Sequence, residues 1–237
     1  MEHDVVIGAD GIRSSVRSEL FGHINPIYRG YTVWRGVAGY EGSALFESAN
    51  SETWGAGKRF GILNVGPQRF VWYAAVSVPC DHVVGPDGRK RDLLETFKGW
   101  HEPIIDLIAA TPDNEIMKHG AYDLVPLRRW GHGRVMLLGD AAHPCTPNLG
   151  QGGGMALEDA AVLAKCIAQN TDLEAALRQY ENQRRHRTKH IQRRSRLMGE
   201  IAQWESRTIV TGRRMVTRLL PARLFERNLR RVYSYRI

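Results

Sequence analysis

The residues best suited to chemistry lie between positions 139 and 154. A Gly139-Asp140 turn is followed by His143, by a loop stiffened by proline, and by the run 150–154, which reads Gly-Gln-Gly-Gly-Gly. Glycines at a helix start leave backbone N–H groups uncovered, and the helix dipole makes that end positive. Such a site attracts a phosphate, a carboxylate or another electron-rich group. The alternative is a flexible loop, which the amphipathic helix directly after the run disfavours.

A second candidate group, Asp10-Gly11, follows the apolar stretch 4–8. That stretch predicts a buried strand, and residues 9–17 predict a turn into a helix. Residues 135–138 predict another buried strand, which ends directly before the Gly-Asp turn. In open α/β sheets ligands bind beyond the carboxyl ends of parallel strands, where both turns would lie. For Asp10 a helix N-cap is the alternative role.

The middle of the chain predicts an antiparallel sheet, because β-branched and aromatic stretches alternate there with Gly, Pro and Asn. The predicted elements are strands at 31–37, 58–65, 69–78 and 115–125, a hairpin turn at 66–68, and one or two short helices within 91–110. We therefore expect a β-rich domain at 26–115, inserted between two pieces of a discontinuous α/β domain at 1–25 and 116–170.

Residues 171–237 predict a basic helical region. A capping box at 171–174 starts one helix, and breaks are expected at Gly199, Gly212 and Pro221. In the helix before it, residues 156, 160, 163 and 167 form the expected inward stripe. Within 178–237 there are 17 Lys/Arg and 4 Asp/Glu, so the net charge of +8 arises in this region. A solvated face is the ordinary interpretation, and peripheral contact with an anionic membrane is the alternative.

Composition narrows the class of protein. The 237 residues suffice for a sizeable core, and no run of 18 apolar residues is present. The N-terminal residues lack a signal-peptide pattern, and the three cysteines form no CxxC pair, so we expect a cytoplasmic location. Asp140, His143 and Cys145 could be read as metal ligands, but zinc would need a further Cys or His at suitable spacing. No aromatic-interleaved nucleic-acid motif occurs.

Two motifs in order resemble single-component FAD-dependent monooxygenases of the aromatic hydroxylase type. Residues 4–17 resemble the Asp-Gly motif of that family, and residues 139–160 resemble its second FAD signature. The segments 146–153 and 156–160 are most similar to zeaxanthin epoxidase-like and urate hydroxylase-like members. The resemblance implies an α/β PHBH-like FAD-binding fold with an antiparallel substrate-domain sheet and C-terminal helices.

The resemblance also implies roles for single residues. Asp140 matches an Asp that hydrogen-bonds the ribityl chain of FAD. Asp10 and Gly11 match a pair associated with the FAD pyrophosphate and, in some members, with NAD(P)H. Pro147 matches a proline that lines the flavin ring, and His143 becomes a conformational residue. The implied cofactor-binding residues are Asp10, Gly11, Gly139, Asp140, Pro147, Gly150, Gln151, Gly152, Gly153 and Gly154.

On the substrate side, the family places the middle sheet across the flavin. Arg35 and Arg59 are the polar candidates, with Trp34, Trp72 and Tyr73 as apolar walls beside Pro147. Arg59 is preferred, because the Gly-Lys-Arg strand faces substrate in urate hydroxylase-like relatives. The alternative is a solvent-exposed strand charge.

The activity that the resemblance implies is monooxygenation. NAD(P)H would reduce FAD, O2 would form a flavin C4a-(hydro)peroxide, and one oxygen atom would pass to an aromatic or alkene substrate, with no protein residue as catalyst. The family's opening βαβ unit with its GxGxxG is not found in this sequence. A truncated, non-catalytic or incomplete fragment is therefore the alternative, and a basic nucleic-acid or membrane-binding module is a third.

Overall fold

The computed structural model describes residues 3–41, 50–80, 88–219 and 232–235. These form two compact units, one made of residues 1–29, 122–201 and 214–237, the other of residues 30–121 and 202–213. The expected region 171–237 is thus divided between the units. Its first helix packs its Leu177 and Tyr180 into the core of the first unit.

The first unit is built on a short parallel strand pair. Strand β1 (Val6–Gly8) pairs in parallel with β8 (Val135–Leu137), and the two-residue strand β7 (Gly131–His132) pairs antiparallel on the other side of β8. Helix α1 (Ser15–Phe21) follows β1. The strand order is β1-β8-β7. The strands expected within 4–8 and 135–138 are therefore present, and they are neighbours. The expected burial holds for most of β8, but Val6 of β1 is 41% exposed.

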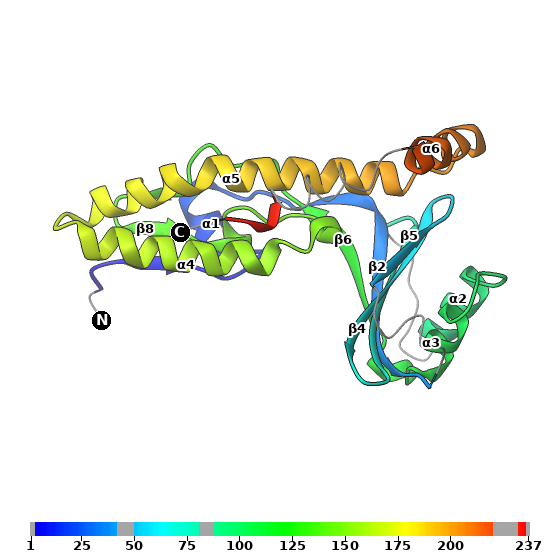
Figure 1. The fold of residues 1–237 in the computed structure, drawn as a ribbon. Coiled ribbons are helices and arrows are strands. Elements are labelled where there is room, and N and C mark those ends of the chain that lie inside the picture. Colours follow the sequence, from blue (N-terminus) through cyan, green and yellow to red (C-terminus); the bar gives the residue numbers. More distant parts are fainter. Residues whose placement is uncertain (1–2, 42–49, 81–87, 220–231, 236–237) are drawn as a thin grey trace. The chain divides into compact units, whose positions relative to one another are not determined.

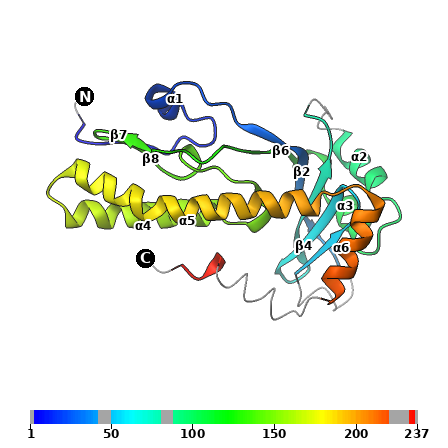
Figure 2. The same cartoon turned by 90° about the horizontal axis from the view of Figure 1, so that it is seen from above.

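Two long helices cover this strand pair and lie side by side (Figures 1 and 2). They are α4 (Gly152–Gln169) and α5 (Leu173–Ala202). The apolar core between strands and helices includes Trp130, Leu137 and Tyr180. Because this core is apolar on all sides, the charged groups that enter it must be paired.

Three expectations about these helices are wrong in detail. On α4 the buried side chains are at 155, 159, 162, 163 and 166, while Ala160 is exposed. The prediction considered apolar residues alone, and the inward face also includes the carboxylate of Asp159. Helix α5 is capped by Asp172 rather than Thr171, since the Asp172 carboxylate accepts the N–H of Glu174 at 2.9 Å. Neither Gly199 nor Gly212 breaks its helix, and Pro221 lies outside the described residues.

The second unit is a five-stranded antiparallel sheet in the order β3-β4-β5-β2-β6. Its strands are β2 (Ile27–Gly39), β3 (Ser51–Trp54), β4 (Lys58–Gly66), β5 (Arg69–Ser77) and β6 (Met117–Asp123). The strands predicted at 31–37, 58–65, 69–78 and 115–125 are thereby confirmed. So is the turn at 66–68, which joins β4 to β5.

One face of this sheet carries the unit's main core. Helices α2 (Arg89–Thr96) and α3 (Ile104–Ala110) contribute Leu93, Leu107 and Ile108 to it, and the sheet contributes Trp34, Phe60 and Trp72 among others. The predicted pair of short helices is confirmed. Helix α6 (Arg207–Leu219) follows α5 in the chain.

Candidate functional site

Both sequence motifs leave the same edge of the parallel strand pair. Gly8 is opposite Leu137 in the register, and the N–H of Leu138 donates to the carbonyl of Gly8 at 2.9 Å. A Cβ on Gly8 would lie 2.8 Å from Val16 and 2.9 Å from Leu137, so glycine is required for α1 to pack this closely. The strand ends thus bring the Asp10-Gly11 turn and the Gly139-Asp140 turn together.

In the first motif, Asp10 binds the start of helix α1. Its Oδ2 accepts the N–H of Ser15 at 2.7 Å and that of Val16 at 3.1 Å. The small desolvation of the carboxyl would raise its pKa, but these hydrogen bonds, with one from Ser14, hold the pKa of Asp10 below its usual value. Asp10 thus binds the first turn of α1, but the N-cap of that helix is Ser14, whose Oγ accepts the N–H of Arg17 at 2.9 Å. Gly11 adopts a φ of 80°, and a Cβ there would contact nothing within 4 Å.

Arg17 joins the two motifs. Its side chain is 1% exposed, and its Nη1 donates to the carbonyl of Ala141 at 2.9 Å while its Nη2 donates to that of Ile12 at 2.6 Å. Burial lowers the pKa of Arg17, and the charge of Asp10 opposes that shift. The guanidinium therefore fixes the spacing between the Asp10 turn and the Asp140 turn.

The Gly139-Asp140 turn is a short 3₁₀ turn, Gly139–Ala141, at the end of β8. Gly139 has a φ of 61°, a backbone conformation that favours glycine. Asp140 is exposed and has no hydrogen-bond partner among the residues that the structure describes. Desolvation raises the pKa of Asp140, and the nearby His143 opposes that shift. This carboxylate is therefore open to hydroxyl or N–H donors of a ligand.

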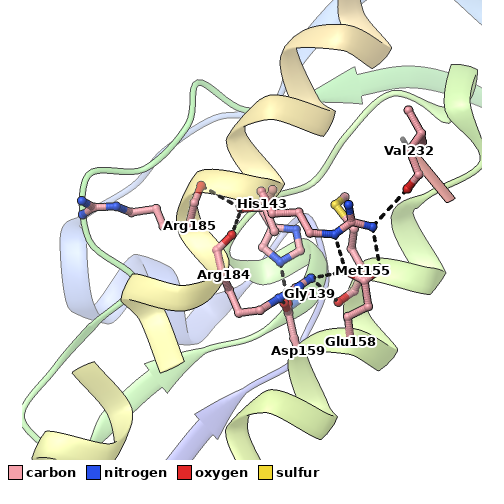
Figure 3. Close-up of polar contacts among 10 residues, drawn as sticks. Gly139, His143, Met155, Glu158, Asp159, Arg184, Arg185 and Val232 are labelled. Atoms are coloured by element: carbon pink, nitrogen blue, oxygen red, sulfur yellow. Dashed lines mark hydrogen bonds and ion pairs between the residues drawn. The ribbon is translucent and has the colours of Figure 1, made fainter. Parts of the chain in front are cut away.

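Beneath this turn lies Asp159 of α4, which is 0% exposed (Figure 3). Its Oδ2 accepts the N–H of Gly139 at 3.0 Å and Nε2 of His143 at 2.5 Å, and its Oδ1 accepts Nε of Arg184 at 2.7 Å. Burial would raise the pKa of Asp159, but the hydrogen bonds and charges of His143 and Arg184 outweigh it, so the pKa lies below its usual value. His143 thus anchors the turn, as the resemblance implied.

Arg184 of α5 extends this network to a second carboxylate. Its Nη2 donates to Glu158 at 2.6 Å (Figure 3). Arg187 donates to both oxygens of Glu158 at 2.7 Å. Desolvation would raise the pKa of Glu158, yet the two arginines lower it below its usual value. The basic run at 184–187 was expected to be a solvated face. Arg184 is instead fully buried, because it neutralises Asp159.

The loop between the turn and α4 is held by a polar stripe on α5. Gln192 donates to the carbonyl of Pro144 at 3.0 Å, and Ser195 donates to that of Thr146 at 2.6 Å. Asn148 donates to the carbonyl of Ser195 at 2.7 Å. The loop therefore has a defined conformation, and Pro147 is exposed within it. The flexible-loop alternative for the glycine run is wrong, because Gly152–Gly154 form the first turn of α4.

The glycine run after the loop is open on its outer side. A Cβ on Gly153 or Gly154 would contact nothing within 4 Å, and one on Gly152 would meet only Cys145 Sγ at 3.8 Å and Asp140 Oδ1 at 3.9 Å. Gly150 has a left-handed φ of 61°, and the side chain of Gln151 is largely buried. Packing within the protein therefore gives no reason for glycine at 152–154, and the Asp140 carboxylate lies beside this helix start.

The substrate-side candidates occupy two opposite faces of the second unit's sheet. Arg59 is 3% exposed, its Nη1 lies 3.1 Å from Oε1 of Glu52, and its guanidinium lies 6.0 Å from the ring centre of Tyr31. The exposed-charge alternative for Arg59 is therefore wrong. Tyr73 lies on the same face, since its partners in the register are Arg35 and Gly61, and Arg35 is exposed.

Trp34 and Trp72 lie on the other face, so the apolar wall expected from Trp34, Trp72 and Tyr73 together is not formed. Adjacent strand residues point to opposite faces, which separates Trp72 from Tyr73. Trp72 is 0% exposed, stacks on Phe60 at 5.4 Å between ring centres, and donates from Nε1 to Thr111 at 2.8 Å. It is a core residue beneath α2 and α3.

One buried site residue, Asp159, was not singled out from the sequence. A signal for Asp159 existed, because it lies in register with Met155, Val162 and Cys166 on an otherwise apolar helix face. A charge on a core face must be paired, and that would have pointed to a buried cation. For Arg17 the sequence suggests Asp10 as a partner, but its hydrogen bonds go to the carbonyls of Ile12 and Ala141, and the second of these is 124 residues away.

Comparison with known proteins adds three findings. The FAD binding domain family model matches residues 2–195. The chain is 42% identical over 228 residues to an aurachin C monooxygenase/isomerase of Stigmatella aurantiaca, covering 96% of this chain and 59% of that protein. It is 38% identical over 209 residues to a chloroplastic zeaxanthin epoxidase of Nicotiana plumbaginifolia, covering 84% of this chain and 32% of that protein.

Among solved structures, that of Klebsiella pneumoniae HpxO in complex with FAD and uric acid is similar, with a TM-score of 0.88 and 31% identity. The match covers 98% of this chain and 59% of that one. The chain thus spans about three fifths of the length of HpxO and of the aurachin relative. The expected PHBH-like architecture is confirmed by this match.

Proposed function

We propose that this chain, which belongs to the FAD binding domain family, binds the flavin and ribityl part of FAD at residues 139–154 and serves a monooxygenase reaction. The relatives named above are a monooxygenase/isomerase and an epoxidase, which makes an oxidoreductase role the natural proposal. Bound FAD would supply the redox chemistry, and the protein would bind, orient and exclude water.

The observation that carries the proposal is the glycine run at the start of α4. Glycine costs a helix roughly 1 kcal/mol relative to alanine. No protein atom lies close enough to require glycine at 153 or 154. A ligand that approaches the bare backbone gives a reason for this cost, because its electron-rich edge would meet uncovered N–H groups at a positive helix end.

Asp140 supports the same ligand. Its carboxylate lies 3.9 Å from the position of a Cβ on Gly152 and has no donor among the described residues. A partly desolvated carboxylate has lost hydrogen bonds to water, so hydroxyl donors of a ligand would stabilise its charge. We therefore assign Asp140 to the ribityl hydroxyls. Gly139, Gly150, Gln151 and Pro147 would shape the same surface, and Asp10 and Gly11 remain proposed for the pyrophosphate end.

For the reaction we propose NAD(P)H as reductant and O2 as oxidant, with a small aromatic or alkene substrate. The uric acid in the HpxO complex is an aromatic heterocycle bound by a structural neighbour. Arg35, Arg59 and Tyr73 share one face of the sheet and remain the proposed substrate contacts. Arg59 is preferred for a polar or anionic substituent, because its guanidinium is buried within the sheet face that it shares with Tyr73, where it pairs with Glu52.

A direct test is titration of the purified chain with FAD, followed by flavin fluorescence and by retention of yellow colour on gel filtration. NADPH oxidation is then measured with and without candidate substrates. Saturable binding is expected, with Gly153→Val weakening it at least tenfold while leaving the unfolding midpoint unchanged. Gly212→Ala, a matched change at an open helical glycine in α6, should leave FAD affinity unaltered. Colourless protein would instead favour an incomplete piece that requires a second polypeptide.

A second role is favoured by helix α6. No helix in the described part of the chain is long and apolar enough to cross a bilayer. Four apolar side chains on α6 are nonetheless exposed, namely Ile209 at 48%, Met215 at 62%, Val216 at 56% and Leu219 at 80%. Helical spacing groups them on one side, with Arg207, Arg214 and Arg218 on the neighbouring side. We propose that this face rests on an anionic membrane surface.

Co-sedimentation with vesicles tests this role. Binding to phosphatidylglycerol-containing vesicles, weakened by salt and absent for pure phosphatidylcholine, is the expected result. Val216→Ser should reduce binding several-fold, while Leu157→Ser, which removes an exposed apolar side chain from α4, should not. Equal loss with both variants, or binding that ignores lipid charge, would contradict the proposal.

A further inference from the structure

The last described residues, 232–235, contact the same loop that is proposed to hold the flavin. Val232 is 1% exposed and lies in one apolar cluster with Leu149, Met155 and Ile191. Leu149 ends the loop, Met155 belongs to the first turn of α4, and Ile191 belongs to α5. A segment more than 75 residues further along the chain therefore packs against the residues on either side of the glycine run.

Tyr233 adds a hydrogen bond to this apolar contact. Its hydroxyl donates to the carbonyl of Leu149 at 3.1 Å, although the residue as a whole is 59% exposed. The carbonyl lies directly before Gly150, whose left-handed backbone turns the chain toward the helix start. The same carbonyl receives only a long contact of 3.4 Å from the side chain of Gln151. Tyr233 is therefore its stronger partner.

Tyr235 contacts the charged network beneath the loop. The guanidinium carbon of Arg184 lies 4.7 Å from its ring centre and that of Arg187 lies 4.4 Å from it. Arg187 also donates from Nη2 to the carbonyl of Val232 at 3.2 Å (Figure 3). Arg184 neutralises Asp159, which accepts the N–H of Gly139, and both arginines pair with Glu158. The Tyr235 ring therefore lies against the two cations of this network.

We propose that residues 232–235 form a clasp that positions the flavin loop, with Tyr233 fixing Leu149-Gly150 and Tyr235 fixing Arg184 and Arg187. The clasp contacts the loop through the Leu149 carbonyl and through the two arginines, and not through the proposed flavin surface. Its members are therefore positioning residues. The inference rests on the proposed FAD site for its functional consequence. Its structural part concerns only contacts within this chain.

Amide hydrogen exchange of the ligand-free protein tests the structural part. Peptides covering 145–155 should exchange about fivefold faster in Tyr233→Phe, which removes one hydrogen bond of ordinary strength, and faster still in Tyr235→Leu. Tyr235→Phe keeps the ring over both arginines and loses only the hydroxyl contact with Arg184, so protection should return to within about twofold of the original protein. Tyr40→Phe, which removes a tyrosine hydroxyl contact of 3.4 Å with Asp106 in the other unit, is the matched control.

FAD titration of the same variants tests the functional part. Tyr233→Phe and Tyr235→Leu should raise the dissociation constant about fivefold and alter the visible circular dichroism of bound flavin, while Tyr235→Phe and Tyr40→Phe should not. Unchanged exchange at 145–155 in both Tyr233→Phe and Tyr235→Leu would overturn the clasp. Failure of the unaltered protein to bind FAD would overturn the proposed function instead, because the exchange results do not depend on the cofactor.

Discussion

Arg184 of α5 donates from Nε to Oδ1 of Asp159 on α4 at 2.7 Å, and both side chains are 0% exposed. The same carboxylate accepts the N–H of Gly139, so a single buried ion pair connects the two long helices to the turn that presents Asp140. A buried charge that loses one of its partners is energetically costly. Substitutions in this ion pair should therefore strongly lower the stability of the first unit.

Replacement of Arg184 by Met should therefore destabilise the protein strongly. The change removes the cation from the buried Asp159 and leaves His143 and the N–H of Gly139 as its partners. Breaking a buried ion pair costs about 3–5 kcal/mol of unfolding free energy. Urea denaturation followed by far-UV circular dichroism measures it. Arg178→Met, which removes an exposed pair with Glu174 at 3.6 Å, should cost less than about 1 kcal/mol. Equal losses for the two variants would contradict this account.

Acid should destabilise the first unit through Asp159 and Glu158. The pKa of each lies below its usual value in the folded protein, so the folded state binds fewer protons than the unfolded state at low pH. The stabilisation is complete above about pH 4–4.5, the ordinary range of unfolded carboxyls, and is lost as the pH falls further. Urea midpoints between pH 7 and pH 3 should show this decline. A shallower decline is expected in Asp159→Asn, and an identical slope would argue against the assignment.

Replacement of Asp140 by Asn should weaken FAD binding without lowering the stability of the folded protein. Desolvation raises the pKa of Asp140, so its charge is disfavoured in the ligand-free protein, and no hydrogen bond to a described residue is lost. The unfolding midpoint should stay the same or rise slightly, whereas FAD affinity should fall at least tenfold. Thermal unfolding and fluorescence titration measure the two effects. A loss of stability without loss of affinity would remove Asp140 from the proposed site.

A side chain at Gly61 should destabilise the sheet, because the Tyr73 ring covers this position. A Cβ at this position would lie 2.2 Å from the Tyr73 ring, its partner in the β4–β5 register. Gly61→Ala should therefore cost about 1–3 kcal/mol of unfolding free energy. Gly39→Ala in the same sheet, where the nearest atom is 3.9 Å away, is the control and should be nearly neutral. In a double-mutant cycle, Tyr73→Ala should recover part of the loss at Gly61, and strict additivity would refute the contact.

The strands and the turns that follow them were predictable because they depend on local rules. Apolar runs ended by Gly-Asp and Asp-Gly indicated the carboxyl ends of parallel strands, and the structure confirms that β1 and β8 are neighbours. Alternation of residues along β5 also implied that Trp72 and Tyr73 point to opposite faces. Which of the two faces is covered by α2 and α3 depends on how these helices pack on the sheet.

The sequence by itself determined the backbone elements, the open glycine helix start and the position of the Asp140 carboxylate beside it. Only the tertiary structure decided which charges are buried and with whom. Asp159 and Arg184 are 25 residues apart on different helices, and Tyr233 meets Leu149 from 84 residues away. Composition and periodicity report local conformation. The partner of a buried charge is chosen by the packing of helices against strands, because only there is water excluded and an unpaired charge penalised.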